Sequence, residues 1–286
     1  MNLVAKREWF RKDVSGAWLA LVVIVAAAGA GGCDKLRARD LLNKGVDAYR
    51  NQHYDVAVDD FKQAKELDPT LLNARLYLAT AYASQYVPGA PSDDNLRMGQ
   101  QAVAEFQDVL KTDPDNLSAI DGIGSMLFNM AVGPPFNADM FRDSESYHLK
   151  HIALKPEDPA PYYWVGYIDW TLANRANQEL RLKYNQDNPH KQIKDDQPLP
   201  PNVRQQFVQD YGSTVDDGID RLKKAVDLQP DDDQAIGMLN LLYRQKADQV
   251  DDMNERDSLE KQADALLDKV KQIKEQRAAA ASSASS

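Results

Sequence analysis

The stretch that decides the fold is residues 45–69, GVDAYRNQHYDVAVDDFKQAKELDP. Small, aromatic and proline residues recur in it at steps of 9, 3, 4, 3 and 5, namely Gly45, Tyr54, Ala57, Phe61, Ala64 and Pro69. Steps of three and four place side chains on one face of a helix. A proline that follows such a run is typical of a helix end.

The same spacing returns further along the chain. Ten residues after each of the four prolines at helix ends stands a small or polar residue: Ala79, Gly124, Gly166 and Asn240. Steps of 4, 3 and 5 lead up to the later prolines in three places: Ala102, Phe106, Val109 and Pro114; Ser144, His148, His151 and Pro156; and Gly218, Leu222, Ala225 and Pro230. A fixed period of this length is typical of an array of stacked repeats.

This spacing resembles the tetratricopeptide repeat (TPR), in which each unit is a pair of antiparallel helices that cross at small residues. The resemblance implies an all-α fold: a right-handed TPR superhelix (solenoid) of about five helix-pair repeats, with insertions between the two helices of units two to five. The units are expected at about 38–71, 72–116, 117–158, 159–232 and 233–276, so the solenoid spans 38–276.

The insertions are expected on one edge of the solenoid, because all of them fall between the two helices of a unit. The longest, at about 177–212, should lengthen both helices of unit four. Its centre, from Asn188 to Pro201, holds too many prolines to be helical. The second helix of unit five is expected at Ser258–Gln276, and the tail, 277–286, is expected to be disordered because it has nothing to bury.

The first 32 residues are predicted to be a secretory signal peptide. A basic start is followed by an apolar run, Ala17–Ala28, and then by small residues that end at Cys33. This arrangement resembles the lipobox of bacterial lipoproteins, in which the cysteine is lipidated after cleavage. The resemblance implies lipidation of Cys33, a short lipid-anchored tether at 33–37, and a location on the periplasmic side of the inner or the outer membrane. An uncleaved membrane anchor is the alternative.

Composition excludes several classes of protein. The chain has 286 residues, 43% of them apolar, and a formal net charge of −10. That charge argues against nucleic-acid binding, and a single cysteine excludes a disulfide framework. No catalytic, phosphate-binding or dinucleotide motif is present, so we expect no enzyme, no cofactor and no metal. His148 and His151 lie one turn apart and could bind a metal, but they occupy core positions of the repeat, which favours packing.

The first helix of each TPR unit lines a concave groove, and this groove is the expected site for a protein or peptide partner. The candidate contact residues are Tyr49, Leu76, Phe128, Tyr163, Tyr167 and Trp170. Three of them, Tyr163, Tyr167 and Trp170, are spaced to share one face of a helix, and aromatic side chains are common interface anchors. The alternative is that an insertion folds over this aromatic stripe and buries it.

The sequence therefore predicts a membrane-anchored, extracytoplasmic TPR lipoprotein that acts as a protein-interaction scaffold in the cell envelope. The alternative is an enzyme, or a protein that binds a small ligand or metal, with a pocket under residues 177–212. Converging histidines and carboxylates in a pocket would favour the alternative, and an open groove would favour the scaffold.

Overall fold

The structure, a computed structural model, describes residues 14–194 and 197–284, with side chains from 32 to 283. Within these residues the chain is helical and contains no strand. The helices, in order, are α1 (Val14–Arg50), α2 (Tyr54–Leu67), α3 (Leu72–Gln85), α4 (Asp93–Thr112), α5 (Leu117–Val132), α6 (Ala138–Leu154), α7 (Pro159–Asp187), α8 (Pro201–Leu228), α9 (Asp233–Ala247) and α10 (Met253–Ala284).

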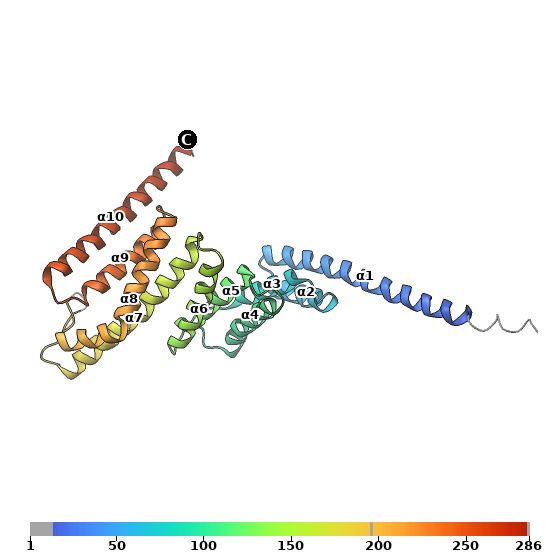
Figure 1. The fold of residues 1–286 in the computed structure, drawn as a ribbon, viewed down its shortest axis with the longest axis horizontal. Coiled ribbons are helices and arrows are strands. Elements are labelled where there is room, and N and C mark those ends of the chain that lie inside the picture. Colours follow the sequence, from blue (N-terminus) through green and yellow to red (C-terminus); the bar gives the residue numbers. More distant parts are fainter. Residues whose placement is uncertain (1–13, 195–196, 285–286) are drawn as a thin grey trace, which may run out of the picture. The chain divides into compact units, whose positions relative to one another are not determined.

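Consecutive helices pack in pairs, so the prediction of an all-α array of about five helix-pair repeats is confirmed (Figure 1). The pairs are α1 with α2, α3 with α4, α5 with α6, α7 with α8, and α9 with α10. The chain divides into two compact units. The first holds α1–α4, and the second holds α5–α10 together with residues 87–92.

Glycines allow the paired helices to approach closely. A Cβ added at Gly45 would lie 2.5 Å from the Phe61 ring, and one at Gly124 would lie 2.8 Å from the His148 ring. At Gly166 the added Cβ would lie 2.5 Å from Cγ of Leu222. Since each glycine faces a residue of the second helix of its own pair, the sequence identified the crossing points correctly.

Short polar residues begin several of the helices. The side chain of Asp158 accepts a hydrogen bond from the amide of Ala160 at the start of α7. Asp232 accepts from the amides of Gln234 and Ala235 at the start of α9. These caps satisfy amides that have no partner within the helix, and they fix where α7 and α9 begin.

Helices α7 and α8 are the long pair, with 29 and 28 residues. The proline-rich connection between them lies outside both helices, and Leu199 within it is 1% exposed. This connection therefore packs onto its own helix pair. The extra length of α7 supplies about half of the residues that line the groove described below.

The two ends of the described chain are more helical than the sequence predicted. Residues 33–37, expected as a tether, are helical and belong to α1, whereas residues 1–13 of the expected signal peptide lie outside the described residues. The expected disordered tail is helical as far as Ala284. Alanine has the highest helix propensity, and Arg277 pairs with Asp233 at 2.6 Å, so α10 continues beyond the last predicted apolar position. In the described part of the chain, no helix combines the length and hydropathy needed to cross a membrane.

Candidate functional site

The aromatic stripe lies on α7. Tyr163, Tyr167 and Trp170 are half-buried, and their rings contact one another in sequence along the helix. The ring centroids are 5.9 Å apart for Tyr163 and Tyr167, and 6.1 Å apart for Tyr167 and Trp170. The structure thus brings these three predicted residues together in one continuous row.

Phe128 does not lie on an open surface. It is 6% exposed, and its ring centroid lies 5.2 Å from that of Phe141, 5.3 Å from Trp164 and 5.0 Å from Tyr167. The spacing placed Phe128 correctly on the first helix of its unit. However, Trp164 and Tyr167 of the next unit close over the ring, so Phe128 supports the stripe from beneath and is not a contact residue.

Tyr49 and Leu76 belong to the first compact unit, apart from the stripe. The hydroxyl of Tyr49 lies 2.8 Å from Oγ of Ser84, and its ring packs against Tyr54 at 5.4 Å. Leu76 is half-buried on α3. Both side chains keep part of their surface open, and neither lines the cavity of about 260 Å³ beside Tyr82 in the same unit.

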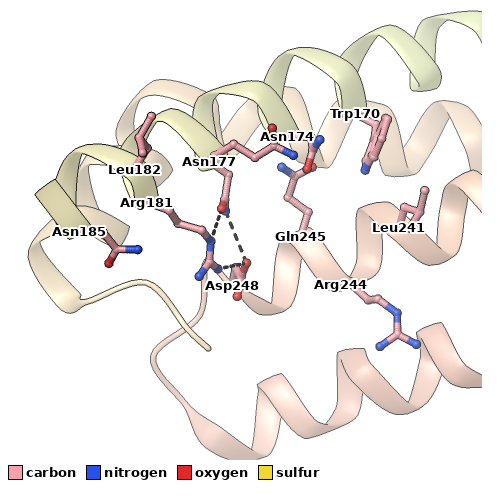
Figure 2. Close-up of a pocket in the computed structure, with 11 residues that line it drawn as sticks. Trp170, Asn174, Asn177, Arg181, Leu182, Asn185, Leu241, Arg244, Gln245 and Asp248 are labelled. Carbon is pink, nitrogen blue, oxygen red and sulfur yellow. Dashed lines mark hydrogen bonds and ion pairs between the residues drawn. The ribbon is translucent and has the colours of Figure 1, made fainter. Parts of the chain in front are cut away.

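A groove of about 470 Å³ runs between α7 and α9, which pack against each other. We call it the α7–α9 groove, and it is lined by Trp170, Asn174, Asn177, Gln178, Arg181, Leu182, Asn185, Leu241, Arg244, Gln245 and Asp248 (Figure 2). Trp170, the last aromatic of the stripe, stands at one end. The lining contains no histidine and a single carboxylate, so it lacks the converging groups that the enzyme alternative requires.

Arg181 holds the far end of the α7–α9 groove together. The side chain is 6% exposed. Its guanidinium donates to Oδ1 of Asn177 at 2.7 Å, to the carbonyls of Lys194 and Gln197 at 2.9 and 2.6 Å, and to Oδ2 of Asp248 at 2.9 Å. Burial raises the pKa of Asp248, and the Arg181 charge opposes that rise. Arg181 therefore ties α7, the proline-rich connection and the end of α9 into one framework.

Amide side chains line the middle of the groove. Gln245 is 7% exposed, and its Oε1 has no hydrogen-bond donor. Asn174, half-buried, and Gln178, exposed, line the groove from α7. Sequence reasoning missed these residues, although Asn174 and Gln178 continue the stripe beyond Trp170 in steps of four and could have been found by that signal.

The two histidines singled out in the sequence are packing residues, as predicted. His148 is 1% exposed and stacks on Trp164 at 5.7 Å, and burial lowers its pKa to about 4. Nδ1 of His151 lies 2.7 Å from Oδ1 of Asp121. No cluster of three or more His, Cys, Asp and Glu side chains suited to a metal ion occurs among the described residues.

Asp169 is a further buried titratable group. It lies on α7 at 4% exposure, and its Oδ2 has no hydrogen-bond partner. Burial, reinforced by the charges of Glu145 and Asp217, raises the pKa of Asp169 to about 8. Because this carboxyl faces the α7–α8 crossing near Gly218, it acts on the stability of the long pair and not on the groove.

Solved structures with a similar fold include MamA proteins, which are TPR proteins. A MamA RS-1 double mutant has a TM-score of 0.55 at 18% identity, covering 84% of this chain and 96% of that one. MamA 41-end from Desulfovibrio magneticus RS-1 has a TM-score of 0.53 at 18% identity, with coverage of 84% and 96%. A further MamA crystal structure gives 0.53 at 15% identity, with coverage of 85% and 94%.

These likenesses establish a TPR-type solenoid and, at such low identity, nothing about function. No protein-family model matches the sequence. No curated protein is similar to it either.

Proposed function

We propose that this protein is a membrane-anchored, extracytoplasmic TPR lipoprotein that works as a protein-interaction scaffold in the cell envelope. The observation that supports it best is the α7–α9 groove, which is open and adjoins a row of half-buried aromatics. A solenoid presents such a surface without moving, and half-buried aromatics are the usual anchors of an interface. The protein then acts by binding and not by catalysis.

Anchoring through Cys33 would hold the first helix pair close to the membrane. Cys33 is exposed, and Ala38, five residues further along α1, is fully buried. At a rise of about 1.5 Å per residue, the thiol lies only about 7 Å along the helix from the core of the first unit. The lipid would therefore fix the solenoid at its N-terminal end and leave the groove-bearing unit to meet its partners.

Site-specific crosslinking tests the scaffold role. A photo-crosslinking residue replaces Gln178, which lies in the α7–α9 groove, and in a matched strain it replaces Gln262, which is exposed on α10. We expect position 178 to capture one or a few defined envelope proteins, and position 262 to capture none of these. Identical capture from both positions, or capture at 178 that persists in Trp170→Ala, would contradict the proposal.

The anchor has its own test. Wild-type protein should sediment with membranes, and mass spectrometry of its N-terminal peptide should show acyl groups on Cys33. Cys33→Ser should be soluble or remain unprocessed. An unmodified thiol in membrane-bound wild-type protein would leave the scaffold role standing and refute the lipoprotein part.

A further inference from the structure

The α7–α9 groove is a product of the insertion peculiar to this chain. α7 has 29 residues, whereas α3, α5 and α9, the first helices of other pairs, have 14, 16 and 15. The lining residues Gln178, Leu182 and Asn185 all fall in the added length. The groove consequently runs along α7 and α9, the first helices of two successive pairs. Since a regular repeat has no such added length, the ligand has to be inferred from the residues that line this groove.

Gln245 has a buried amide oxygen that lacks a hydrogen-bond donor. Its side chain is 7% exposed, lines the groove, and leaves Oε1 unpaired. A buried acceptor without a donor is costly and rare in folded proteins. Across from it, Asn174 is half-buried and Gln178 is exposed, and Figure 2 shows Asn174 and Gln245 projecting into the space between α7 and α9. A ligand that donates a hydrogen bond would satisfy Oε1 of Gln245, and a ligand that also accepts would pair with the amides of Asn174 and Gln178.

The charged residues of the lining favour a neutral ligand. Arg181 is paired with Asp248 at 2.9 Å, and Arg244 with Asp264 at 2.7 Å. Each positive charge is thus already neutralised by a neighbour. The Arg181–Asp248 pair is largely buried, and a carboxylate ligand that took Arg181 would leave Asp248 unpaired, which makes such ligands unfavourable.

Apolar side chains stand at both ends of the groove. Trp170 and Leu241, the latter 37% exposed, lie at one end, and Leu182, 60% exposed, lies at the other. From residue 170 to 182 the helix rises about 18 Å. An extended chain covers that length with about five residues, so apolar side chains at both ends of such a segment would reach the apolar residues of the groove.

We infer that the α7–α9 groove binds the main chain of an uncharged, extended segment of about five or six residues, with an apolar side chain at each end. The segment lies along α7 and α9, and its peptide N–H and C=O groups pair with Gln245, Asn174 and Gln178. This inference rests on the proposed scaffold function, because it specifies which part of a partner protein the groove takes.

Synthetic hexapeptides, acetylated and amidated to remove terminal charges, test the inference. One library has Leu at both ends and four uncharged residues between them; a second carries Asp or Lys at a central position; a third repeats the first with N-methylated central amides. Binding to the full chain in mild detergent is measured by fluorescence anisotropy. We expect the neutral library to bind, and the charged and N-methylated libraries to bind at least tenfold more weakly.

Two matched variants separate recognition from folding. Gln245→Met keeps the side-chain volume and removes the hydrogen bonds, so we expect affinity to fall about tenfold while the melting temperature stays the same or rises. Gln262→Met, on the exposed face of α10, should change neither. Unchanged affinity in Gln245→Met, or tighter binding of the charged library, would overturn the inference.

The peptide-binding and crosslinking results together distinguish this inference from the proposed scaffold function. Capture of a defined partner at position 178, with no binding of any neutral peptide, would leave the scaffold standing and refute the extended-segment ligand. Failure of both experiments would refute both proposals.

Discussion

Replacing Gly166 with alanine should destabilise the α7–α8 pair, although alanine is normally the better helix residue. The new Cβ would lie 2.5 Å from Cγ of Leu222 and 3.1 Å from the carbonyl oxygen of Gly218. Neither atom is the end of a flexible side chain, so the helices must move apart. Overpacking of this kind costs about 1–3 kcal/mol, against a gain of about 0.5–1 kcal/mol in helix propensity. We expect a net loss of about 1–2 kcal/mol.

Gly237 provides a matched control in α9. It is also helical, but a Cβ added there meets nothing within 4 Å. Gly237→Ala should therefore show the propensity gain alone and stabilise the protein by about 0.5–1 kcal/mol. The same substitution is expected to change stability in opposite directions at the two sites.

Thermal and urea unfolding of the two variants measure the difference. For a chain of this size, 1 kcal/mol corresponds to about 2–4 °C in melting temperature, so Gly166→Ala should melt a few degrees below wild type and Gly237→Ala slightly above it. Because repeats are stabilised by their neighbours, the loss at Gly166 should shift the unfolding of adjoining pairs as well. Equal or raised melting in Gly166→Ala would refute the close crossing.

Three further substitutions test the site and the buried titratable groups. Trp170→Ala should cost about 1–3 kcal/mol, less than a fully buried aromatic, and abolish crosslinking from position 178, because the ring is only half-buried. Burial raises the pKa of Asp169 to about 8, against 3.8 for the free group, so between these pH values the folded state holds a proton that the unfolded state has lost. The free energy of unfolding of the wild type should therefore decline as pH rises from about 4 to 8. Asp169→Asn should remove this decline, as measured by urea titration at several pH values. Burial lowers the pKa of His148 to about 4, against 6.5 for the free group, so its contribution to the free energy of unfolding is lost as pH falls from 6.5 to 4. His148→Gln should therefore flatten the acid side of the plot of stability against pH.

The helix pairs could be predicted because their signals are local. Small residues at Gly45, Gly124 and Gly166 and prolines at helix ends recur at fixed steps, and each reports a crossing or an end within one unit. The end of α10 could not be found in this way. It depends on the helix propensity of an alanine run and on the pairing of Arg277 with Asp233, and neither forms part of the repeat.

The candidate site was predictable only in part, for a related reason. The row of Tyr163, Tyr167 and Trp170 follows from helical spacing alone. Phe128 was placed on the correct helix, but the prediction that it is a contact residue was wrong because its exposure depends on residues of the next unit, Trp164 among them. The spacing within a unit carries no information on how its neighbour packs.

The α7–α9 groove shows why function in a solenoid is concentrated where the repeat is interrupted. Within a regular unit, the spacing assigns most positions to packing, and little freedom remains for recognition. The added turns of α7 lie outside the repeat pattern, so their side chains are not assigned to packing by it, and they carry Gln178 and Arg181. Arg181 uses its hydrogen bonds to hold the framework, whereas Gln245, on the facing helix, leaves its Oε1 unpaired. A buried amide with an unpaired oxygen lowers stability, and its presence beside an open groove is most simply explained by a ligand that completes it.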